Sequence, residues 1–207
     1  MAISAAYGAA GSLIGSTVAE RLGVPFVERG IPMAVAERLE VPLDDALAHD
    51  EQPAPSLLER LLAGFHGGEP LVAPLPAESV TAEDFHRASE EVLRQQAATG
   101  SGVILGRGAV AALREDPRVL RVRLTGSPET RERWATKLGR VDEATARAGR
   151  RGMDQAQAEY LRRFYGVRIE DPDLYHLVLD APSVGLAVCV EIITCGARAF
   201  VGAPSPG

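Results

Sequence analysis

The sequence predicts an α/β fold in which helices cover both faces of a five-stranded parallel sheet. Short apolar segments alternate with longer segments in which apolar residues recur at helical spacing, as in sheets built from strand–helix units. Residues 103–105 have no polar position, which is typical of a strand buried on both faces of such a sheet. The expected strands are residues 2–5, 24–27, 103–105, 119–125 and 177–179. We expect a single domain over residues 1–202 and a loose tail over residues 203–207.

The first strand leads into a loop of small residues and then directly into a helix. The loop reads Gly8-Ala9-Ala10-Gly11-Ser12, and an amphipathic pattern then runs to Leu22, where Gly23 is placed to end the helix. Small residues let the backbone approach an anion, and the N–H groups and dipole of a helix's first turn favour a phosphate. The backbone N–H groups of Gly8 through Leu13 are therefore the predicted phosphate cradle. A standard loop of this kind carries a lysine, whereas Lys137 is the only lysine of this chain.

The next part of the chain combines a short strand, two helical patterns and a proline-rich segment. Residues 24–27 lead to Glu28-Arg29-Gly30, and a helical pattern covers about residues 33–39. Residues 42–78 contain six prolines and one amphipathic helical pattern, over residues 57–65. We interpret residues 42–78 as a mobile insertion over a site, with a plain surface excursion as the alternative.

Capping signals place the later helices. Thr81 opens a capping-box pattern that predicts a helix ending near residue 100. Ser127 has the side chain of an N-cap and precedes a proline, so one arginine-rich helical stretch is expected over about residues 128–166. The closing helix is expected over about residues 184–200.

Two expectations concern burial. In the strand over residues 119–125, Arg121 and Arg123 alternate with apolar residues, so one face of this strand is expected to be less buried. Cys189 and Cys195 lie six residues apart in an apolar segment, which is not zinc-ligand spacing, and both are expected to be reduced core residues.

Charge and hydropathy limit the classes of partner. A net charge of −6 leaves no overall basic field, so nucleic acid is not an expected partner. Lysine and arginine total 22 and nearly all are arginine, which suits phosphate recognition, with genome composition as the alternative explanation. No basic-then-apolar signal opens the chain, and the most apolar stretch, residues 184–194, is too short to span a bilayer. We expect a cytoplasmic protein with a small-molecule partner and no membrane partner. Assembly into a homo-oligomer is a further alternative.

Four sequence segments occur in an order found in one protein family. They are residues 4–26 with the small-residue loop, residues 103–108 with Gly106-Arg107 after an apolar strand, residues 124–133, and residues 150–157. In these segments the chain resembles the cytidylate kinase-like family, a branch of the P-loop nucleoside monophosphate kinases. The resemblance covers most of residues 1–195 and implies the P-loop kinase fold, with a mobile arginine-rich lid over residues 131–168.

The chain departs from the pattern of this family at four positions. Glu28 stands where the family commonly has Asp, and Gly108 replaces the Asp that follows Gly-Arg in cytidylate kinases. In the fourth segment, Arg151 replaces the first Asp and Gln157 replaces the final Arg. The contact that Asp makes with the acceptor's sugar in those kinases is therefore not expected of Gly108.

The resemblance implies ATP as phosphoryl donor, held with Mg²⁺ at the backbone of Gly8 through Leu13. A hydroxyl near the loop, that of Ser12, is the candidate metal ligand, with a simple helix N-cap as the alternative. The candidate acceptor-binding residues are Glu28, Arg29, Arg107 and Asp154. Arg107 follows a central strand at the edge where open α/β sheets bind ligands, and a surface salt bridge is its alternative role.

Nine arginines lie from Arg131 to Arg168, and a lid would bring such cations to the transferred phosphoryl group. The candidate catalytic residues are Arg131, Arg150 and Arg151, and a solvated helix face with Glu partners is the alternative for each. One hypothesis is an ATP-dependent phosphotransferase for a small phosphate acceptor, above all a nucleoside monophosphate such as CMP. A second is a weakly active or inactive nucleotide-binding protein that serves as a sensor or assembly partner. A third is a kinase of a non-nucleotide metabolite.

Overall fold

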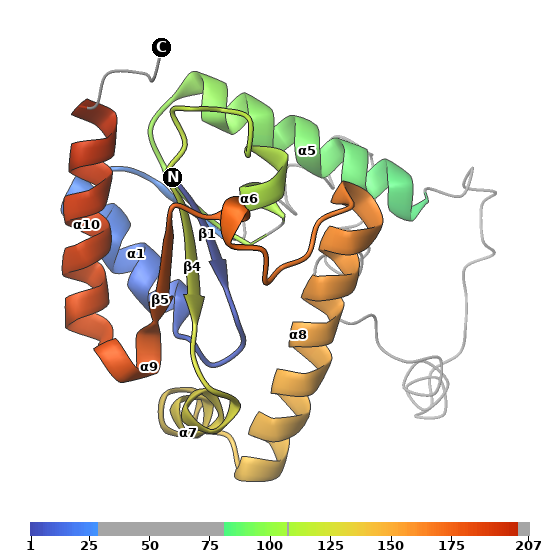
Figure 1. Ribbon diagram of the computed structural model, residues 1–207, viewed down its shortest axis with the longest axis vertical. Coiled ribbons are helices and arrows are strands. Elements are labelled where there is room, and N and C mark those ends of the chain that lie inside the picture. The colour runs from blue at the N-terminus through green and yellow to red at the C-terminus, as the bar shows by residue number, and fades with distance from the viewer. Residues whose placement is uncertain (29–80, 107, 203–207) are drawn as a thin grey trace, which may run out of the picture.

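The computed structural model describes residues 1–28, 81–106 and 108–202, which form one parallel sheet with helices on both faces (Figure 1). The strand order is β2-β3-β1-β4-β5, and all neighbouring strands are parallel. The strands are β1 (Ala2–Ala5), β2 (Phe26–Val27), β3 (Val103–Leu105), β4 (Arg121–Thr125) and β5 (Leu177–Asp180). The predicted fold class is confirmed. Because β1 is the central strand, the loop that follows it lies at the middle of the sheet's carboxyl edge.

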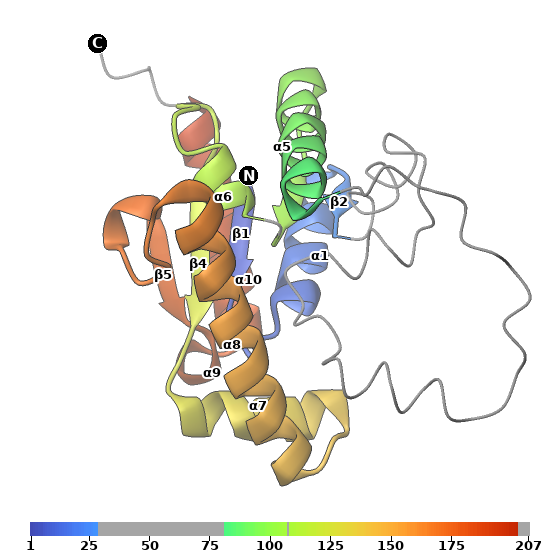
Figure 2. The same cartoon turned by 90° about the vertical axis from the view of Figure 1, so that its right-hand side faces the viewer.

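Two layers of helices cover this sheet. The helices are α1 (Gly11–Leu22), α5 (Ala82–Thr99), α6 (Ala109–Ala112), α7 (Pro128–Gly139), α8 (Glu143–Tyr165), α9 (Ala181–Val184) and α10 (Leu186–Gly202). Helices α1 and α10 lie together on one face, whereas α5, α6 and α8 lie on the other (Figures 1 and 2). Helix α7 lies beyond the carboxyl end of β4, beside the first half of α8 (Figure 1).

Each face of the sheet has its own apolar cluster. Ile14 of α1 and Ile193 of α10 are fully buried on one face, where they pack in the same cluster as Ile3 of β1. On the other face, Leu93 of α5 belongs to a buried cluster with Ile104 of β3. Full burial of one such side chain contributes about 1.5–3 kcal/mol, so the sheet is a firm base for the loop at its edge.

The capping signals work as the sequence predicts. The Asp84 N–H donates to Thr81 Oγ1 at 3.2 Å, and the Thr81 N–H donates to Asp84 Oδ2 at 2.9 Å. The Thr130 N–H donates to Ser127 Oγ at 3.3 Å at the start of α7. Both predicted helix starts are therefore confirmed.

The arginine-rich stretch after Ser127 is two helices, so the prediction of one helical stretch is wrong in this detail. Arg140, after the end of α7, has a positive φ of 54°. Asp142 then caps α8 by accepting a hydrogen bond from the Thr145 N–H at 2.7 Å. A left-handed residue followed by an N-cap side chain turns the chain, and α8 returns along the sheet toward β1 (Figure 1).

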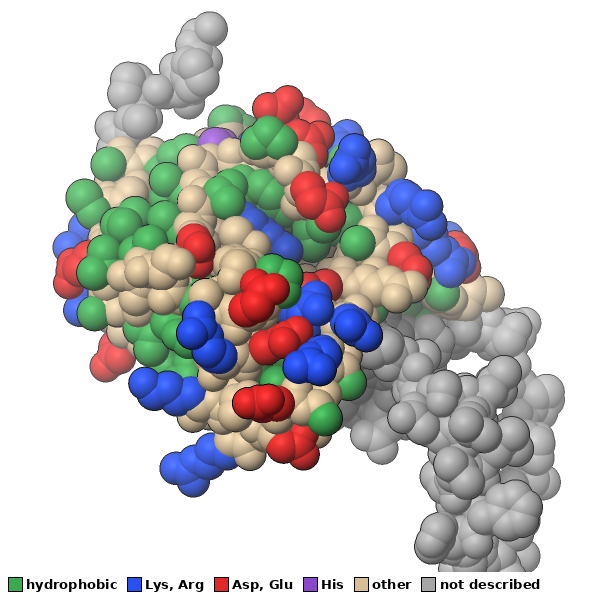
Figure 3. Space-filling view, turned by 60° about the horizontal axis from the view of Figure 1, so that its bottom comes forward, with side chains coloured by type: hydrophobic (Ala, Val, Ile, Leu, Met, Phe, Trp, Pro, Cys, Tyr) green, Lys and Arg blue, Asp and Glu red, His purple; other side chains and the backbone are tan. Residues whose placement is uncertain are grey.

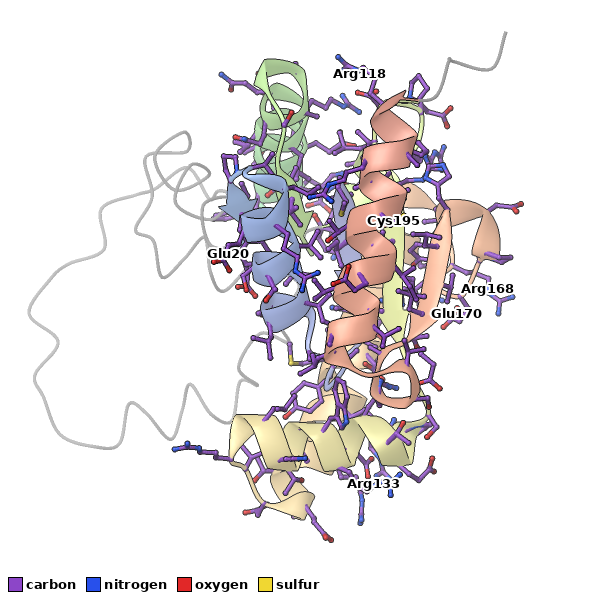
Figure 4. The ribbon with its side chains drawn as sticks, turned by 90° about the vertical axis from the view of Figure 1, so that its left-hand side faces the viewer. Glu20, Arg118, Arg133, Arg168, Glu170 and Cys195 are labelled. Atoms are coloured by element: carbon purple, nitrogen blue, oxygen red, sulfur yellow. The ribbon has the colours of Figure 1, made fainter. Side chains whose placement is uncertain are left out.

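The two burial expectations hold in part. On β4, Arg121 and Thr125 are half-buried whereas Val122 and Leu124 are fully buried, so one face is less buried, as expected. Arg123 on that face is nevertheless only 9% exposed, and its Nη1 donates to Ser4 Oγ of β1 at 2.6 Å. Cys189 is buried, whereas Cys195 is exposed on α10 (Figure 4). The segments predicted over residues 33–39, 42–78 and 203–207 lie outside the described residues. Among the described helices, none has the length and apolar character that crossing a bilayer requires.

An aromatic cluster joins α5 to the end of α8. The ring of His86 stacks on Phe164 at 4.2 Å between centroids, and His86 Nδ1 lies 3.2 Å from Tyr160 Oη. Phe164 and Tyr165 are helix-packing groups, since both rings contact His86. Burial lowers the pKa of His86, and the nearby Glu90 carboxylate opposes this shift.

The lowered pKa of His86 predicts acid sensitivity of the fold. As the pH falls below about 6.5, the unfolded chain takes up a proton before folded His86 does, so the free energy of unfolding decreases until folded His86 is also protonated. We expect His86→Phe, which keeps an aromatic ring against Phe164, to lose less stability than the native chain between pH 7 and 5. The pKa of His176 is also lowered by burial, so some acid sensitivity remains in the variant. Chemical denaturation between pH 7 and 5 measures the free energy of unfolding of both proteins. An identical dependence of this free energy on pH in the native chain and in His86→Phe would contradict the prediction.

Candidate functional site

The loop between β1 and α1 is held in a strained and tightly packed conformation. Gly8 and Ala10 have positive φ values of 76° and 55°. The left-handed conformation costs about 1–2 kcal/mol for a residue with a Cβ, and such strain concentrates at functional sites. A Cβ on Gly11 would lie 2.5 Å from Ala5 Cβ, so the start of α1 sits directly against the end of β1. The first N–H groups of α1 have no acceptor inside the helix and are available to a ligand.

A cleft of about 560 Å³ opens beside this loop at the carboxyl edge of the sheet. Its lining includes five of the six residues predicted as the phosphate cradle, since Ala9 is buried. Four apolar side chains from three helices also line it: Leu13, Trp134, Leu138 and Met153. Leu13 and Leu138 are 49% and 44% exposed, so both side chains present apolar surface at the cleft. The cleft therefore presents helix N–H groups next to an apolar wall.

The described residues contribute one charged side chain to the lining of the cleft. Among the described residues that line it, Glu28 at the end of β2 is the one side chain that is charged at neutral pH. Ser12 Oγ of α1 donates a hydrogen bond to Glu28 Oε1 at 2.5 Å. Two oxygen-bearing side chains thus meet beside the first turn of α1, where the negative charge of Glu28 would repel a phosphate. Hydroxyl and carboxylate oxygens are ligands that Mg²⁺ accepts, so the pair of Ser12 and Glu28 fits a magnesium ion. The charge of this ion would offset the charges of the carboxylate and of a phosphate.

Arg131 and Asp154 meet beneath the loop, outside the lining of the cleft. Arg131 is 6% exposed, and its Nη2 donates to Asp154 Oδ2 at 2.8 Å. The Tyr7 N–H donates to Asp154 Oδ1 at 3.2 Å, and Tyr7 O accepts from Arg131 Nη1 at 2.9 Å. The structure therefore brings these two predicted site residues together around the backbone of Tyr7.

The predicted arginines of α8, Arg150 and Arg151, lie near Glu132 of α7. Arg150 Nε donates to Glu132 Oε1 at 2.7 Å, and Arg147 Nε lies 3.7 Å from Glu132 Oε2. Hydrogen bonding to Arg150, with the charges of Arg147 and Arg151 nearby, lowers the pKa of the Glu132 carboxyl. Figure 3 shows basic and acidic side chains interleaved on this end of the molecule. Arg151 itself is exposed.

Gln157 joins α8 to the end of β1 at the floor of the cleft. Its Nε2 donates to Ala5 O at 3.2 Å, and its Oε1 is buried without a partner among the described residues. A void of about 10 Å³, which Gln157 and Ser4 help to line, adjoins it. Gln157 therefore supplies a neutral anchor at a position where the resembling family has a cation.

The predicted residues thus divide into three groups. The loop residues and Glu28 share the cleft, Arg131 and Asp154 hold Tyr7, and Arg150 pairs with Glu132. Arg29 and Arg107 lie outside the described residues. Sequence reasoning did not single out the site contacts of Tyr7, Leu138 and Met153, although the Tyr-Gly pair ahead of the loop was a visible signal.

A second and larger cavity, of about 790 Å³, lies at the opposite, amino edge of the sheet. Its lining includes Met1, Gly102 and Phe200 from the starts of β1 and β3 and the end of α10. It shares no described residue with the cleft beside the loop. Arg118, which also lines it, lies at the far end of the molecule from Arg133 of α7 (Figure 4).

Comparison with known proteins shows what the chain is similar to. A model described as the cytidylate kinase-like family matches residues 1–183, and a search of curated proteins gave no significant match. An uncharacterised protein from Eubacterium ventriosum is similar in structure, with a TM-score of 0.65, 18% identity, and coverage of 96% of this chain and 97% of that one. A protein from Thermus thermophilus has a TM-score of 0.50, 16% identity, and coverage of 96% and 95%. Shikimate kinase from Bacteroides thetaiotaomicron has a TM-score of 0.49, 15% identity, and coverage of 98% and 97%.

Proposed function

Because the chain belongs to the cytidylate kinase-like family, we propose that it transfers a phosphoryl group from ATP to a small phosphate acceptor, above all a nucleoside monophosphate such as CMP. The observation that carries this proposal is the position of the first turn of α1. Its free N–H groups face a cleft at the carboxyl edge of a parallel sheet, where proteins of this architecture bind phosphates.

The described residues suggest which part of the site would bind the phosphates and which would bind the metal ion. The backbone of Gly8 through Leu13 would bind the donor phosphates, and Ser12 with Glu28 would hold Mg²⁺. Bound Mg²⁺ supplies charge neutralisation between the phosphates in reactions of this class. Arg150 and Arg151 are the proposed sources of further positive charge, and for Arg150 the phosphate must compete with Glu132. Arg29 and Arg107 remain proposed contacts to the acceptor.

The scarcity of cations among the described residues at the loop supports a second candidate, a nucleotide-binding protein with little or no turnover. No lysine stands in the loop, the described residues lining the cleft carry no cation, and Gln157 is neutral. Loss of one charged donor from a phosphoryl-transfer site costs about 10²–10³ in rate. A kinase of a non-nucleotide metabolite is the third candidate, because Gly108 offers no side chain to a sugar.

Two measurements on one sample distinguish these candidates. The protein is mixed with ATP, Mg²⁺ and a panel of nucleoside monophosphates and sugar phosphates, and ADP release and thermal stability are both recorded. A ligand at 100 times its dissociation constant raises the free energy of unfolding by about 2.7 kcal/mol. We expect stabilisation by ATP with Mg²⁺ and ADP release with a monophosphate. Stabilisation without ADP release would support the binding protein, and the absence of any nucleotide effect would contradict both readings.

A further inference from the structure

We propose that α7 and α8 set the shape of the phosphate loop by holding Tyr7, and that Arg131 and Asp154 are positioning residues of this device. The proposal rests on the proposed function for one point only, that the loop binds phosphate. It assigns these two residues a task other than contact with a substrate. We call the group of Tyr7, Arg131, Gly149 and Asp154 the loop clamp.

The clamp first holds the backbone of Tyr7. Its N–H donates to a carboxylate oxygen of Asp154 on α8, at 3.2 Å. Its carbonyl oxygen accepts from Nη1 of Arg131 on α7, at 2.9 Å. Both polar backbone groups of the residue that precedes Gly8 are therefore fixed by side chains from two different helices. The N–H belongs to the peptide before Tyr7 and the carbonyl to the peptide after it, so rotation of either peptide would break a hydrogen bond to one of these helices.

Arg131 has almost no capacity left for a ligand. Its Nε donates to Gly126 O at 2.9 Å, and its Nη1 and Nη2 donate to the Asp154 carboxylate at 3.1 and 2.8 Å. With the bond to Tyr7 O, four of the five guanidinium N–H groups have partners. A phosphate that bound both Nη1 and Nη2 of Arg131 would have to displace Asp154, whose side chain is 27% exposed, and would remove its ion-pair partner, which is unfavourable.

The clamp also holds the ring of Tyr7 by shape. A Cβ on Gly149, inside α8, would lie 2.8 Å from Tyr7 Cζ. Glycine inside a helix costs about 1 kcal/mol relative to alanine, so its presence here makes room for this ring. The neighbouring Gly8 is equally close to α7, since a Cβ on it would lie 2.2 Å from Arg131 O. The hydrogen bonds of Tyr7 and the close packing at Gly8 and Gly149 therefore fix the loop to the same two helices, α7 and α8.

This arrangement couples the helices that follow β4 to the ligand-binding loop. The backbone N–H groups of Gly8 through Leu13 keep their orientation only while Asp154 of α8 and Arg131 of α7 hold Tyr7. A shift of α8 that separates Asp154 from Arg131 would release the start of the loop. Substitutions in the clamp should therefore loosen the loop even in the absence of any ligand.

The test measures hydrogen exchange of the Tyr7 and Ala9 amides by NMR in the ligand-free protein. The variants are Arg131→Lys, which keeps the charge but loses the fork, and Gly149→Ala, which leaves every charge in place. The matched control is Arg133→Lys on the exposed side of α7 (Figure 4). We expect both amides to exchange about tenfold faster in the two clamp variants and at the native rate in the control. If Arg131→Lys does not fold, Gly149→Ala carries the test alone.

Nucleotide-dependent thermal stabilisation is recorded on the same samples. Native exchange rates in the clamp variants would overturn the proposal, and native rates with lost nucleotide binding would show that Arg131 contacts the ligand directly. Faster exchange in a chain that binds no nucleotide would support the clamp and contradict the proposed function. Failure of the clamp and failure of the function therefore give different results.

Discussion

Gly8→Ala is expected to lose nucleotide binding and about 2–5 kcal/mol of stability. Two costs add at this position: the left-handed backbone, at about 1–2 kcal/mol, and overpacking, at about 1–3 kcal/mol. Gly8 has a φ of 76°, and an added Cβ would lie 2.2 Å from the backbone oxygen of Arg131. A backbone oxygen inside α7 cannot move aside as a flexible side chain can, so the loop and the helix must separate.

Gly23→Ala is the matched control for this substitution. Gly23 has a similar positive φ of 66°, but nothing lies within 4 Å of the position of its Cβ. It should therefore show only the backbone cost of about 1–2 kcal/mol and keep native nucleotide binding. Chemical denaturation and isothermal titration with ATP and Mg²⁺ measure both quantities. Equal effects of the two substitutions would show that the contact between the loop and α7 is unimportant.

Glu28→Gln is expected to change how nucleotide binding depends on Mg²⁺. The Glu28 carboxylate is the charged side chain among the described residues that line the cleft, and it lies beside the turn proposed to bind phosphate. Removing its charge should strengthen binding of metal-free ATP by about fivefold, the factor expected for a repulsion of about 1 kcal/mol. The same change replaces one carboxylate oxygen by an amide nitrogen and removes the negative charge offered to the proposed ion, so the benefit of adding Mg²⁺ should fall about tenfold.

The control for this prediction is Glu20→Gln, at an exposed position of α1 outside the lining of the cleft (Figure 4). It changes the net charge by the same amount, so it corrects for long-range electrostatics. Titration calorimetry with ATP in EDTA and in Mg²⁺ gives the four affinities that are needed. A Glu28→Gln protein with an unaltered Mg²⁺ requirement would place the ion elsewhere.

The sequence predicts the framework of this protein better than its side-chain partnerships. Helix starts at Thr81 and Ser127 follow from local rules that need no tertiary context, and both are confirmed. The break at Arg140 was missed because its left-handed backbone has no strong local signal in a non-glycine residue. Burial of Arg123 depends on a partner, Ser4, that lies 119 residues away in the chain.

In the site, too, features that depend on adjacent residues were predicted, whereas contacts between distant segments were not. The loop from Gly8 to Leu13 was predicted because its chemistry is local to strand, turn and helix. The contacts of Arg131 with Tyr7 and Asp154 join three segments that only the fold brings together. Sequence resemblance predicts Arg131 and Asp154 as candidate site residues without stating what they contact. The positions of Arg29 and Arg107, outside the described residues, stay a prediction.

An NMR titration of the ¹⁵N-labelled chain with ATP and Mg²⁺ tests the phosphate-loop assignment most directly. We predict a saturable response in which the amides of Gly8, Gly11, Ser12 and Leu13 shift most, because phosphate oxygens accept hydrogen bonds from the first turn of α1. Saturable binding with the largest shifts at Gly102 and Ala197, which line the 790 Å³ cavity at the amino edge, would contradict this assignment.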